Sequence, residues 1–318
     1  RQPQIDSRFP TSPHDLACAF PSLDVVMPKI ALVTATEAET LDEDLPPLIA
    51  AFNGEATAVR WDDPAVDWSS FDLVLLRSTW DYVPRLAEFL AWCERVAAQT
   101  LLLNPPALVR WNTDKHYLAD LAAQGLATVP SHFLEPGRHR AAELQGIVAQ
   151  LASEEFVVKP AVGAGSKDAQ RYRRRQLQTA IRHVDVLLVD GRSVLVQPYL
   201  DQVDSAGETA LMFFDGAFSH AIRKGPLLRL DEGPTEHLFA PEDITARTPS
   251  SDELALATRV VAAIPGGAPL YARVDLLRAA DGSPCVLELE LTEPSLFFPY
   301  HAQSAERYVD AARRRLQR

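Results

Sequence analysis

Hydrophobic and polar positions follow two recurring patterns along the chain. Short apolar runs such as KIALVTA (29–35) and FDLVLL (71–76) predict buried strands, and RLAEFLAWCERVAAQ (85–99) has the spacing of an amphipathic helix. Between residues 27 and 106 such elements follow one another in β–α–β order, and a pair of prolines ends the series. This order predicts an α/β domain built on a parallel sheet.

The remaining chain continues with strands, helices and hairpins, and we expect four regions in all. They are an extension at 1–26, an α/β domain at 27–106 on the substrate side, a central lobe at 107–200 and a C-terminal lobe at 201–318. The extension lacks the basic start and apolar segment of a secretory signal. Because Met27 stands just before the first convincing strand, we expect native folding to begin there and the extension to be a tag or mis-start.

Composition and charge narrow the class of protein. The chain has 318 residues, of which 47% are hydrophobic, and a net charge of −12, which argues against broad binding to nucleic acid or an anionic membrane. Its three cysteines are widely spaced and form no CxxC pair, so neither a disulfide framework nor a zinc site is indicated. No apolar run reaches the roughly 18 residues of a membrane helix. We therefore expect a soluble cytoplasmic protein.

Two loops of the first domain follow strands of the predicted parallel sheet, where ligands commonly bind. One loop contains Thr36. The other brings together a cation, two hydroxyls, an acid and two aromatic rings, which suits a small zwitterion; it consists of Arg77, Ser78, Thr79, Trp80, Asp81 and Tyr82. A loop that merely caps a helix would also explain the hydroxyls and the acid.

Two lysines and a glycine loop stand out in the next region. The segment WNTDKHYLADLAAQG (111–125) predicts one helix with Lys115 in its first turn, and Lys159 ends the apolar strand EEFVVKP. The loop that follows contains Gly163, Gly165 and Ser166, whose backbone N–H groups can approach a phosphate closely. A plain turn would also account for the glycines, and an exposed lysine is usually only solubilising.

A proline and a hairpin mark the start of the last region. Pro198 in SVLVQPYL cannot occupy an ordinary central position of a sheet, so this segment predicts a hinge between two sheets. Asp215 and Gly216 predict a type I′ turn between two strands. Along the second strand Ser219, Ala221 and Arg223 share one face, and His220, Ile222 and Lys224 share the other.

Four charged residues occupy two strands that a turn at 281–282 connects. Side chains alternate along strands, so Arg273 and Asp275 share one face and Glu288 and Glu290 share another. If the register brings these faces together, three carboxylates and one guanidinium meet. Such carboxylates repel one another unless a cation neutralises them, which favours Mg²⁺. The alternative is a set of charges on a solvent-facing sheet.

The order of these features, from Met27 to His301, resembles that of the ATP-grasp superfamily. The resemblance implies an N-terminal βαβ domain followed by two lobes that clasp ATP, in a fold that is α/β overall and α+β in its nucleotide-binding half. It also implies ATP and Mg²⁺, in two ions, as cofactors. The motifs RSTWDY, NPP, WNTDKHYL, KP…GAGS and LELELTEPSLFF are most similar to the glutathione-synthetase-like branch.

The resemblance also implies roles for single residues. For ATP it implies Lys115, Lys159, Gly163, Gly165, Ser166, Gln197, Pro198, Tyr199, Leu200, Asp204 and Glu208. For the substrate we expect Thr36, Ser78, Thr79, Trp80, Asp81, Tyr82 and His220, and for the transferring phosphoryl or acyl phosphate Arg273 and Arg223. The metal ligands would be Asp275, Glu288 and Glu290. Glu290 replaces the asparagine of the family pattern, so a part for Glu293 at the metal stays open.

The activity that the resemblance implies is ADP-forming carbon–nitrogen ligation. ATP would convert a small-molecule carboxylate or amino acid into an acyl phosphate, which an amine then attacks. The branch includes the ligase that closes O-ureido-D-serine to D-cycloserine in antibiotic biosynthesis. Alternatives are an intermolecular peptide ligase, a small-molecule kinase and a non-catalytic nucleotide-binding module. Homodimers are common in the family, and we expect residues 225–243 to form an active-site loop.

Overall fold

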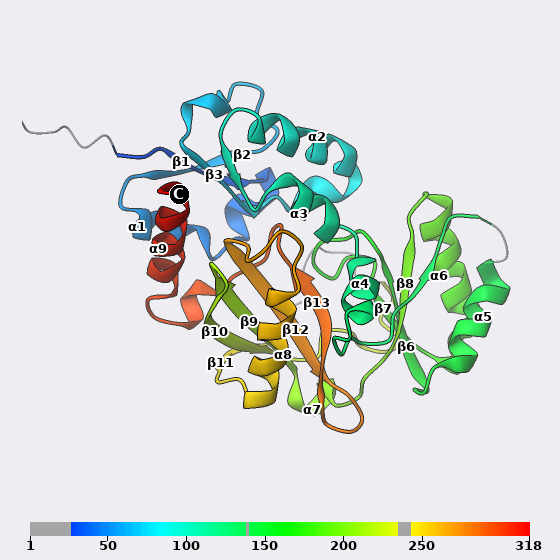
Figure 1. Cartoon of the computed structure of the whole chain (residues 1–318). Helices are drawn as coiled ribbons and strands as arrows, with labels where there is room; N and C mark the ends of the chain where they lie inside the picture. The colour runs from blue at the N-terminus through cyan, green and yellow to red at the C-terminus, as the bar shows by residue number, and fades with distance from the viewer. Residues whose placement is uncertain (1–26, 138–139, 235–242) are drawn as a thin grey trace, which may run out of the picture.

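Three sheets and their flanking helices make up the molecule (Figure 1). The computed structural model describes residues 27–137, 140–234 and 243–318, so the predicted extension and residues 235–242 of the predicted loop lie outside the described residues. Within these ranges no helix has both the length and the apolar character that a membrane span needs. The mixed α/β class expected from the sequence is confirmed.

The first sheet is parallel and four-stranded. Its strands lie in the order β2 (Ala56–Arg60), β1 (Ile30–Thr34), β3 (Leu73–Ser78) and β4 (Leu101–Leu103). Strands β1 and β3 are buried along their whole length, which is why they appear in the sequence as continuous apolar runs.

Helices cover both faces of this sheet. Alternate residues of β1 enter different cores: Ile30 and Leu32 pack with α1 (Leu45–Phe52), whereas Ala31 and Val33 pack with α2 (Leu86–Ala97). Three short 3₁₀ helices complete the domain; they are η1 (Thr36–Thr40), η2 (Trp68–Ser70) and η3 (Trp80–Arg85).

The second sheet is antiparallel, with the order β5 (His132–Leu134), β8 (Val194–Pro198), β6 (Glu155–Pro160) and β7 (Gln170–Arg173). Helices α5 (Arg140–Gln150) and α6 (Leu177–Val189) cover its outer face, on the right of Figure 1. The 3₁₀ helix η4 (Arg174–Gln176) precedes α6. Pro198 ends β8 beyond its pairing with β5, so its missing N–H breaks no bond there.

The third sheet is antiparallel and five-stranded. Its order is β11 (Ile244–Arg247), β10 (Ala217–Lys224), β9 (Glu208–Phe214), β12 (Tyr271–Arg278) and β13 (Pro284–Glu290). Asp215 and Gly216 both have positive φ, at 49° and 80°, as the predicted type I′ turn requires. Helix α8 (Ser251–Ala262) packs on one face, and the short helix α7 (Val203–Ala206) leads into β9.

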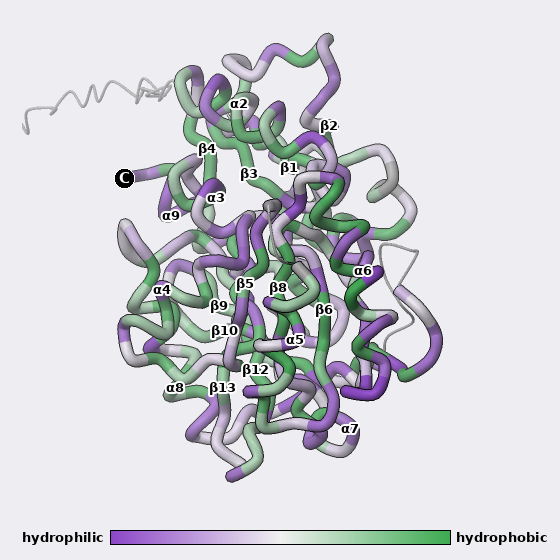
Figure 2. Tube along the Cα trace, turned by 90° about the vertical axis from the view of Figure 1, so that its right-hand side faces the viewer, coloured by the Kyte–Doolittle hydropathy of each residue, from purple (hydrophilic) through white to green (hydrophobic). Residues whose placement is uncertain are grey.

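The end of the chain joins the third sheet to the first. Helix α9 (Ser304–Leu316), which follows η5 (Phe298–Tyr300), lies beside α1 in Figure 1. Tyr308 and Val309 of α9 share one core with Ile30 of β1 and Met212 of β9. Figure 2 shows hydrophobic residues gathered in the strands and hydrophilic residues along the outer loops.

One predicted helix was wrong in its extent. Residues 111–125 do not form a single helix: α3 (Pro106–Asn112) ends just inside this segment, and α4 (Tyr117–Ala123) begins after a turn. Lys115 lies in that turn, where its backbone N–H donates to the carbonyl of Ala161 at 2.9 Å. This contact from a distant loop places Lys115 beside the end of β6.

Candidate functional site

A cavity of about 440 Å³ lies between the sheets, a size typical of small-molecule sites. Each sheet contributes part of its wall. Strands β6 and β8 and the glycine loop form one side, strands β9, β10, β12 and β13 form the opposite side, and loops of the first domain close one end. Strand ends and loops far apart in the sequence therefore meet in one space.

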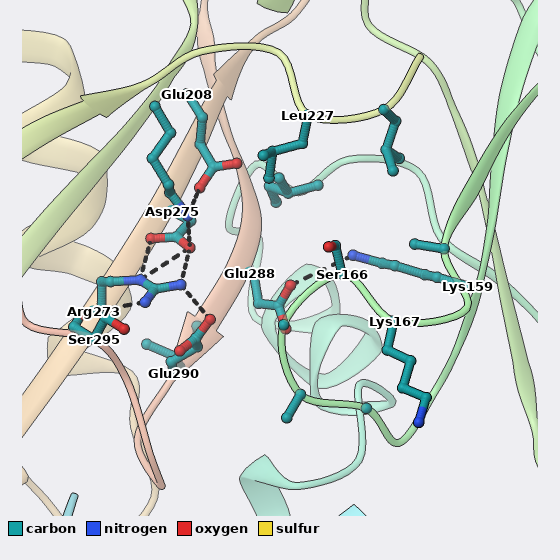
Figure 3. A pocket seen from close by; sticks show the side chains of 18 of the residues that line it. Lys159, Ser166, Lys167, Glu208, Leu227, Arg273, Asp275, Glu288, Glu290 and Ser295 are labelled. Atoms are coloured by element: carbon teal, nitrogen blue, oxygen red, sulfur yellow. Dashed lines mark hydrogen bonds and ion pairs between the residues drawn. The ribbon is translucent and has the colours of Figure 1, made fainter. Parts of the chain in front are cut away.

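The two predicted phosphate-binding lysines meet at Glu288. The Nζ of Lys115 lies 3.0 Å from Oε1 of Glu288, and the Nζ of Lys159 lies 3.5 Å from Oε2. Figure 3 shows Lys159 extending across the cavity toward this carboxylate. Lys115 also donates to the carbonyl of Gly163 at 3.0 Å, which ties the lysine to the glycine loop.

The charges of these three residues are interdependent. Burial alone would raise the pKa of Glu288, but Lys115 and then Lys159 outweigh burial and lower it to about 2. Burial lowers the pKa of Lys159, whereas the pKa of Lys115 is raised because its attraction to Glu288 exceeds the cost of burial. One carboxylate thus keeps two closely placed ammonium groups inside the protein.

The strand pair β12 and β13 has the register that the sequence analysis required. Arg273 lies opposite Glu290, and Asp275 lies opposite Glu288. The guanidinium of Arg273 bonds to both oxygens of Asp275, at 2.9 Å from Nε and 2.8 Å from Nη2, and also pairs with Glu290 (Figure 3).

A lysine that the sequence analysis did not single out completes this network. Lys224 of β10 lies 3.1 Å from Asp275 and pairs with Glu208 of β9. Burial raises the pKa of Glu208 and of Glu290 to about 7 in each case, although Lys224 and Arg273 oppose the shift. The pKa of Asp275 is lowered despite burial, because Arg273 and then Lys224 favour its charged form.

The donor set of the predicted metal site fits Mg²⁺. Asp275, Glu288 and Glu290 offer carboxylate oxygens, which Mg²⁺ prefers, and burial raises the pKa of Glu290 although Arg273 opposes the shift. In the described parts of the chain, however, no three His, Cys, Asp or Glu side chains gather as a ready metal cluster. The condition on the register is met, but Asp275 and Glu290 share Arg273, whereas Glu288 pairs with Lys115 and Lys159.

The predicted adenine hinge lines the same cavity. Gln197, Pro198, Tyr199 and Leu200 all contribute to the wall, and the Nε2 of Gln197 donates to Ser131 at 3.0 Å. Gly163, Gly165, Ser166 and Glu208 also line it. Asp204 does not: its carboxylate lies 3.4 Å from Arg171, outside this cavity.

The loop after β3 is only partly at the cavity. Trp80 and Tyr82 line it, whereas the other predicted substrate residues of this domain lie elsewhere. Ser78 is fully buried and lies 3.0 Å from the hydroxyl of Thr34, Asp81 accepts from the indole of Trp61 at 2.7 Å, and Thr79 is buried. Thr36 is exposed and accepts from Arg60.

Two residues of β10 that were predicted at the site do not line the cavity. Arg223 lies on the face away from the cavity, where its Nε donates to the carbonyl of Ala206 at 3.0 Å. His220 is buried outside the cavity, and its Nε2 lies 2.8 Å from the carbonyl oxygen of Leu296. Lys224 occupies the position at the cavity that we expected for Arg223.

Four further residues place functional groups at the cavity. Lys224 could have been recognised from the alternation along β10, whereas Lys167 and Asn112 gave no signal; Figure 3 shows the amino group of Lys167 pointing away from the acids. The amide of Asn112 bonds to both Leu289 and Leu291 at 2.7 Å and so holds the edge of β13. Glu293 lines the cavity as well.

Comparison with known proteins gives the family. Residues 30–104 match the family described as D-cycloserine synthetase DcsG, N-terminal domain. The chain is 45% identical over 296 residues to the cycloserine biosynthesis protein DcsG of Streptomyces lavendulae, covering 90% of this chain and 98% of that protein.

Solved structures show the same similarity to DcsG. The crystal structure of D-cycloserine synthetase DcsG has a TM-score of 0.85 at 44% identity, covering 90% of this chain and 99% of that one. More distant structures share the fold: the ATP-grasp ligase PsnB, with a TM-score of 0.60 at 18% identity (91% and 99% covered), and the D-alanine–D-alanine ligase of Bacillus anthracis, with 0.59 at 14% (91% and 97%). The chain belongs to the DcsG family of ATP-grasp ligases and is an enzyme of the ligase class.

Proposed function

We propose that this enzyme closes O-ureido-D-serine to D-cycloserine, using ATP to activate the substrate carboxylate as an acyl phosphate. The observation that carries this proposal is the 45% identity to a cycloserine biosynthesis protein over 98% of that protein's length. The cavity supports it, because it brings together cations suited to phosphates and carboxylates suited to Mg²⁺.

The nucleotide would lie between the second and third sheets. We assign its adenine to the hinge at Gln197–Leu200 and its phosphates to Lys115, Lys159 and the glycine loop, all of which line one side of the cavity. PsnB, which shares this fold, has been solved with Mg and ADP, and the D-alanine–D-alanine ligase has been solved with ATP. The lobes at 107–200 and 201–318 would then clasp the nucleotide, with the first domain on the substrate side.

Asp275, Glu288 and Glu290 would hold Mg²⁺, in two ions on the family pattern. Bound there, the metal would supply positive charge to the nucleotide phosphates during transfer. Because Glu288 also pairs with both lysines, phosphates that attract Lys115 and Lys159 would release its oxygens for the metal. Glu208 lines the same wall and pairs with Lys224, and we assign it to the nucleotide as well.

The proposed reaction has two steps. The γ-phosphoryl group of ATP passes to an oxygen of the substrate carboxylate, which releases ADP, while Arg273 and Lys224 stabilise the developing negative charge. The substrate nitrogen bonded to oxygen then attacks the acyl carbon, loses its proton, and phosphate leaves as the ring closes. The product lacks the substrate's carbamoyl group, so this group must leave with consumption of one water, as carbon dioxide and ammonia.

The test is ADP release with recorded product masses. We expect O-ureido-D-serine alone to sustain Mg²⁺-dependent turnover, with one ADP and one ammonia formed for each D-cycloserine. Amino acids supplied singly and in pairs provide the comparison. Turnover only with pairs would replace ring closure by intermolecular ligation, and a stable phosphorylated product would replace it by a kinase reaction.

A further inference from the structure

Glu293 differs from the four carboxylates that strands β9, β12 and β13 place at the cavity. Glu208, Asp275, Glu288 and Glu290 each pair with a lysine or arginine inside the cavity. Glu293 forms no ion pair within the described ranges 27–137, 140–234 and 243–318; its carboxylate accepts a hydrogen bond from the hydroxyl of Tyr82, a neutral group. The cavity therefore contains a buried carboxylate that has no ion-pair partner among the described residues.

Side chains of the first domain fix Glu293 in this position. The indole Nε1 of Trp80 donates to the backbone carbonyl of Glu293 at 2.9 Å, and Nη2 of Arg77 donates to the carbonyl of Pro294 at the same distance. Trp80 and Tyr82 themselves line the cavity and are almost fully buried. The end of β3 and the loop after it thus hold this segment with three contacts, two to the backbone carbonyls of Glu293 and Pro294 and one to the Glu293 carboxylate.

The same short segment also contacts the cation proposed for the substrate carboxylate. Nη1 of Arg273 donates to the carbonyl of Ser295 at 3.2 Å, only two residues beyond Glu293. The guanidinium of Arg273, which also bonds Asp275 and Glu290, and the carboxylate of Glu293 therefore both line the cavity and are tied to the segment 293–295, with the aromatic ring of Phe297 beside Arg273. A cation and a carboxylate that both face the cavity are complementary to an amino acid, whose carboxylate and ammonium are joined through one carbon.

We propose that Glu293, oriented by Tyr82, binds the α-ammonium group of the substrate and makes a free amine a requirement of the enzyme. This inference rests on the proposed function, because O-ureido-D-serine carries such an ammonium group beside the carboxylate that is activated. Trp80 adds an aromatic wall that favours a cation. Burial and then Glu290 raise the pKa of Glu293 to about 8, and the hydrogen bond from Tyr82 and the charge of Lys115 offset only part of this shift.

The test compares two substrates in two proteins. The substrates are O-ureido-D-serine and its deamino analogue, 3-(ureidooxy)propanoate; the proteins are the wild type and Glu293→Gln, whose amide has the shape of the protonated acid. Removal of the amine should lower kcat/KM about 10²-fold or more in the wild type and only a few-fold in Glu293→Gln, where no charge remains to be satisfied. In Tyr82→Phe, removal of the amine should lower kcat/KM by a factor that lies between those of the wild type and Glu293→Gln.

Glu43→Gln is the matched control. It makes the same chemical change on an exposed acid at the edge of the cavity, and it should discriminate against the deamino analogue as strongly as the wild type does. If Glu293→Gln is too slow to assay, dissociation constants of the two compounds in the presence of ADP give the same comparison.

The outcomes separate the two proposals. In one outcome, the wild type turns over O-ureido-D-serine while removal of the amine lowers kcat/KM by the same factor in the wild type and in Glu293→Gln. That result would overturn the role of Glu293 and leave the proposed function standing. An equal loss together with a raised Mg²⁺ requirement in Glu293→Gln would assign this carboxylate to the metal instead. No turnover or binding of O-ureido-D-serine by the wild type would overturn the proposed function, and the role of Glu293 with it.

Discussion

Glu288 illustrates what single residues contribute to this site. Its carboxylate lies within ion-pair distance of two lysines, one from the turn before α4 and one from the end of β6. The sequence assigned Glu288 to a metal but gave no indication of this pairing, because the three residues lie far apart along the chain. Glu288 thus balances the charge of the two lysines that we propose for the phosphates.

Glu288→Gln should therefore affect both catalysis and stability. We expect kcat to fall by about 10²-fold or more, because a ligand charge is lost where charge develops. We also expect a stability loss of about 3 kcal/mol, since Lys115 and Lys159 lose the carboxylate that keeps them charged in a buried place. Thermal unfolding and ADP release measure the two effects.

Pyrophosphate without metal distinguishes this explanation from simple misfolding. An anion that binds both lysines should raise the Tm of Glu288→Gln by more than it raises the Tm of the wild type. Equal shifts, or wild-type turnover in the variant, would be incompatible with the assigned role of Glu288.

At the scale of elements, strand alternation determines which charges reach the cavity. Arg223 and Lys224 are neighbours in β10, and because successive side chains point to opposite faces, only Lys224 lines the cavity. The sequence placed Arg223 and Lys224 on different faces correctly. It could not tell which face the cavity adjoins, since that depends on how the sheets pack.

Substituting the two neighbours separately tests this assignment. Lys224→Met should reduce kcat by at least about 10²-fold, because Asp275 and Glu208 lose their shared cation. Arg223→Met should leave kcat within a few-fold of the wild type. ADP release under saturating ATP provides the comparison, and the reverse order of effects would restore Arg223 to the catalytic role first expected of it.

Most elements were predictable because their signals are local. Buried strands, the end of β8 at Pro198 and the turn at Asp215 and Gly216 follow from apolar runs and backbone preferences. The helix expected at 111–125 failed for a local and a distant reason. The carboxylate of Asp114 bonds to the backbone of His116, and Lys115 bonds to Ala161, so the turn at these residues replaces a continuous helix.

At the scale of the whole molecule, the first domain holds the segment that follows β13. The carboxylate of Asp44 accepts from the backbone N–H groups of Leu296, Phe297 and Phe298, and Trp80 reaches Glu293 across a sequence separation of 213 residues. Propensities and periodicity carry no information about such contacts. For this reason Ser78, Thr79 and Asp81 were expected at the substrate, whereas the neighbouring Arg77 and Trp80 position the distant segment instead.

This packing gives the ligand-free protein a particular pH dependence. Burial raises the pKa of Glu293 to about 8, above its ordinary value of 4.5, so the folded protein binds this proton more tightly than the unfolded chain does. The stability that the protonated Glu293 carboxyl contributes is therefore complete below pH 4.5 and is lost as the pH rises through 8. We expect Tm to fall between about pH 4.5 and 8 in the absence of nucleotide and Mg²⁺, and this contribution to change no further above pH 8.

Glu293→Gln identifies the source of this slope. Its amide carries no proton to lose, so its Tm should fall less steeply over the same range than that of the wild type. Identical slopes in the two proteins would show that another group determines the pH dependence.

Activation of the substrate carboxylate by ATP can be tested by following the oxygen atoms of the substrate. O-ureido-D-serine labelled with ¹⁸O at both carboxylate oxygens is turned over with unlabelled ATP, and the phosphate and the ring product are analysed by mass. Activation as an acyl phosphate predicts one ¹⁸O in the released phosphate and one in the carbonyl of D-cycloserine. Unlabelled phosphate accompanying ring closure would show that ATP does not activate this carboxylate.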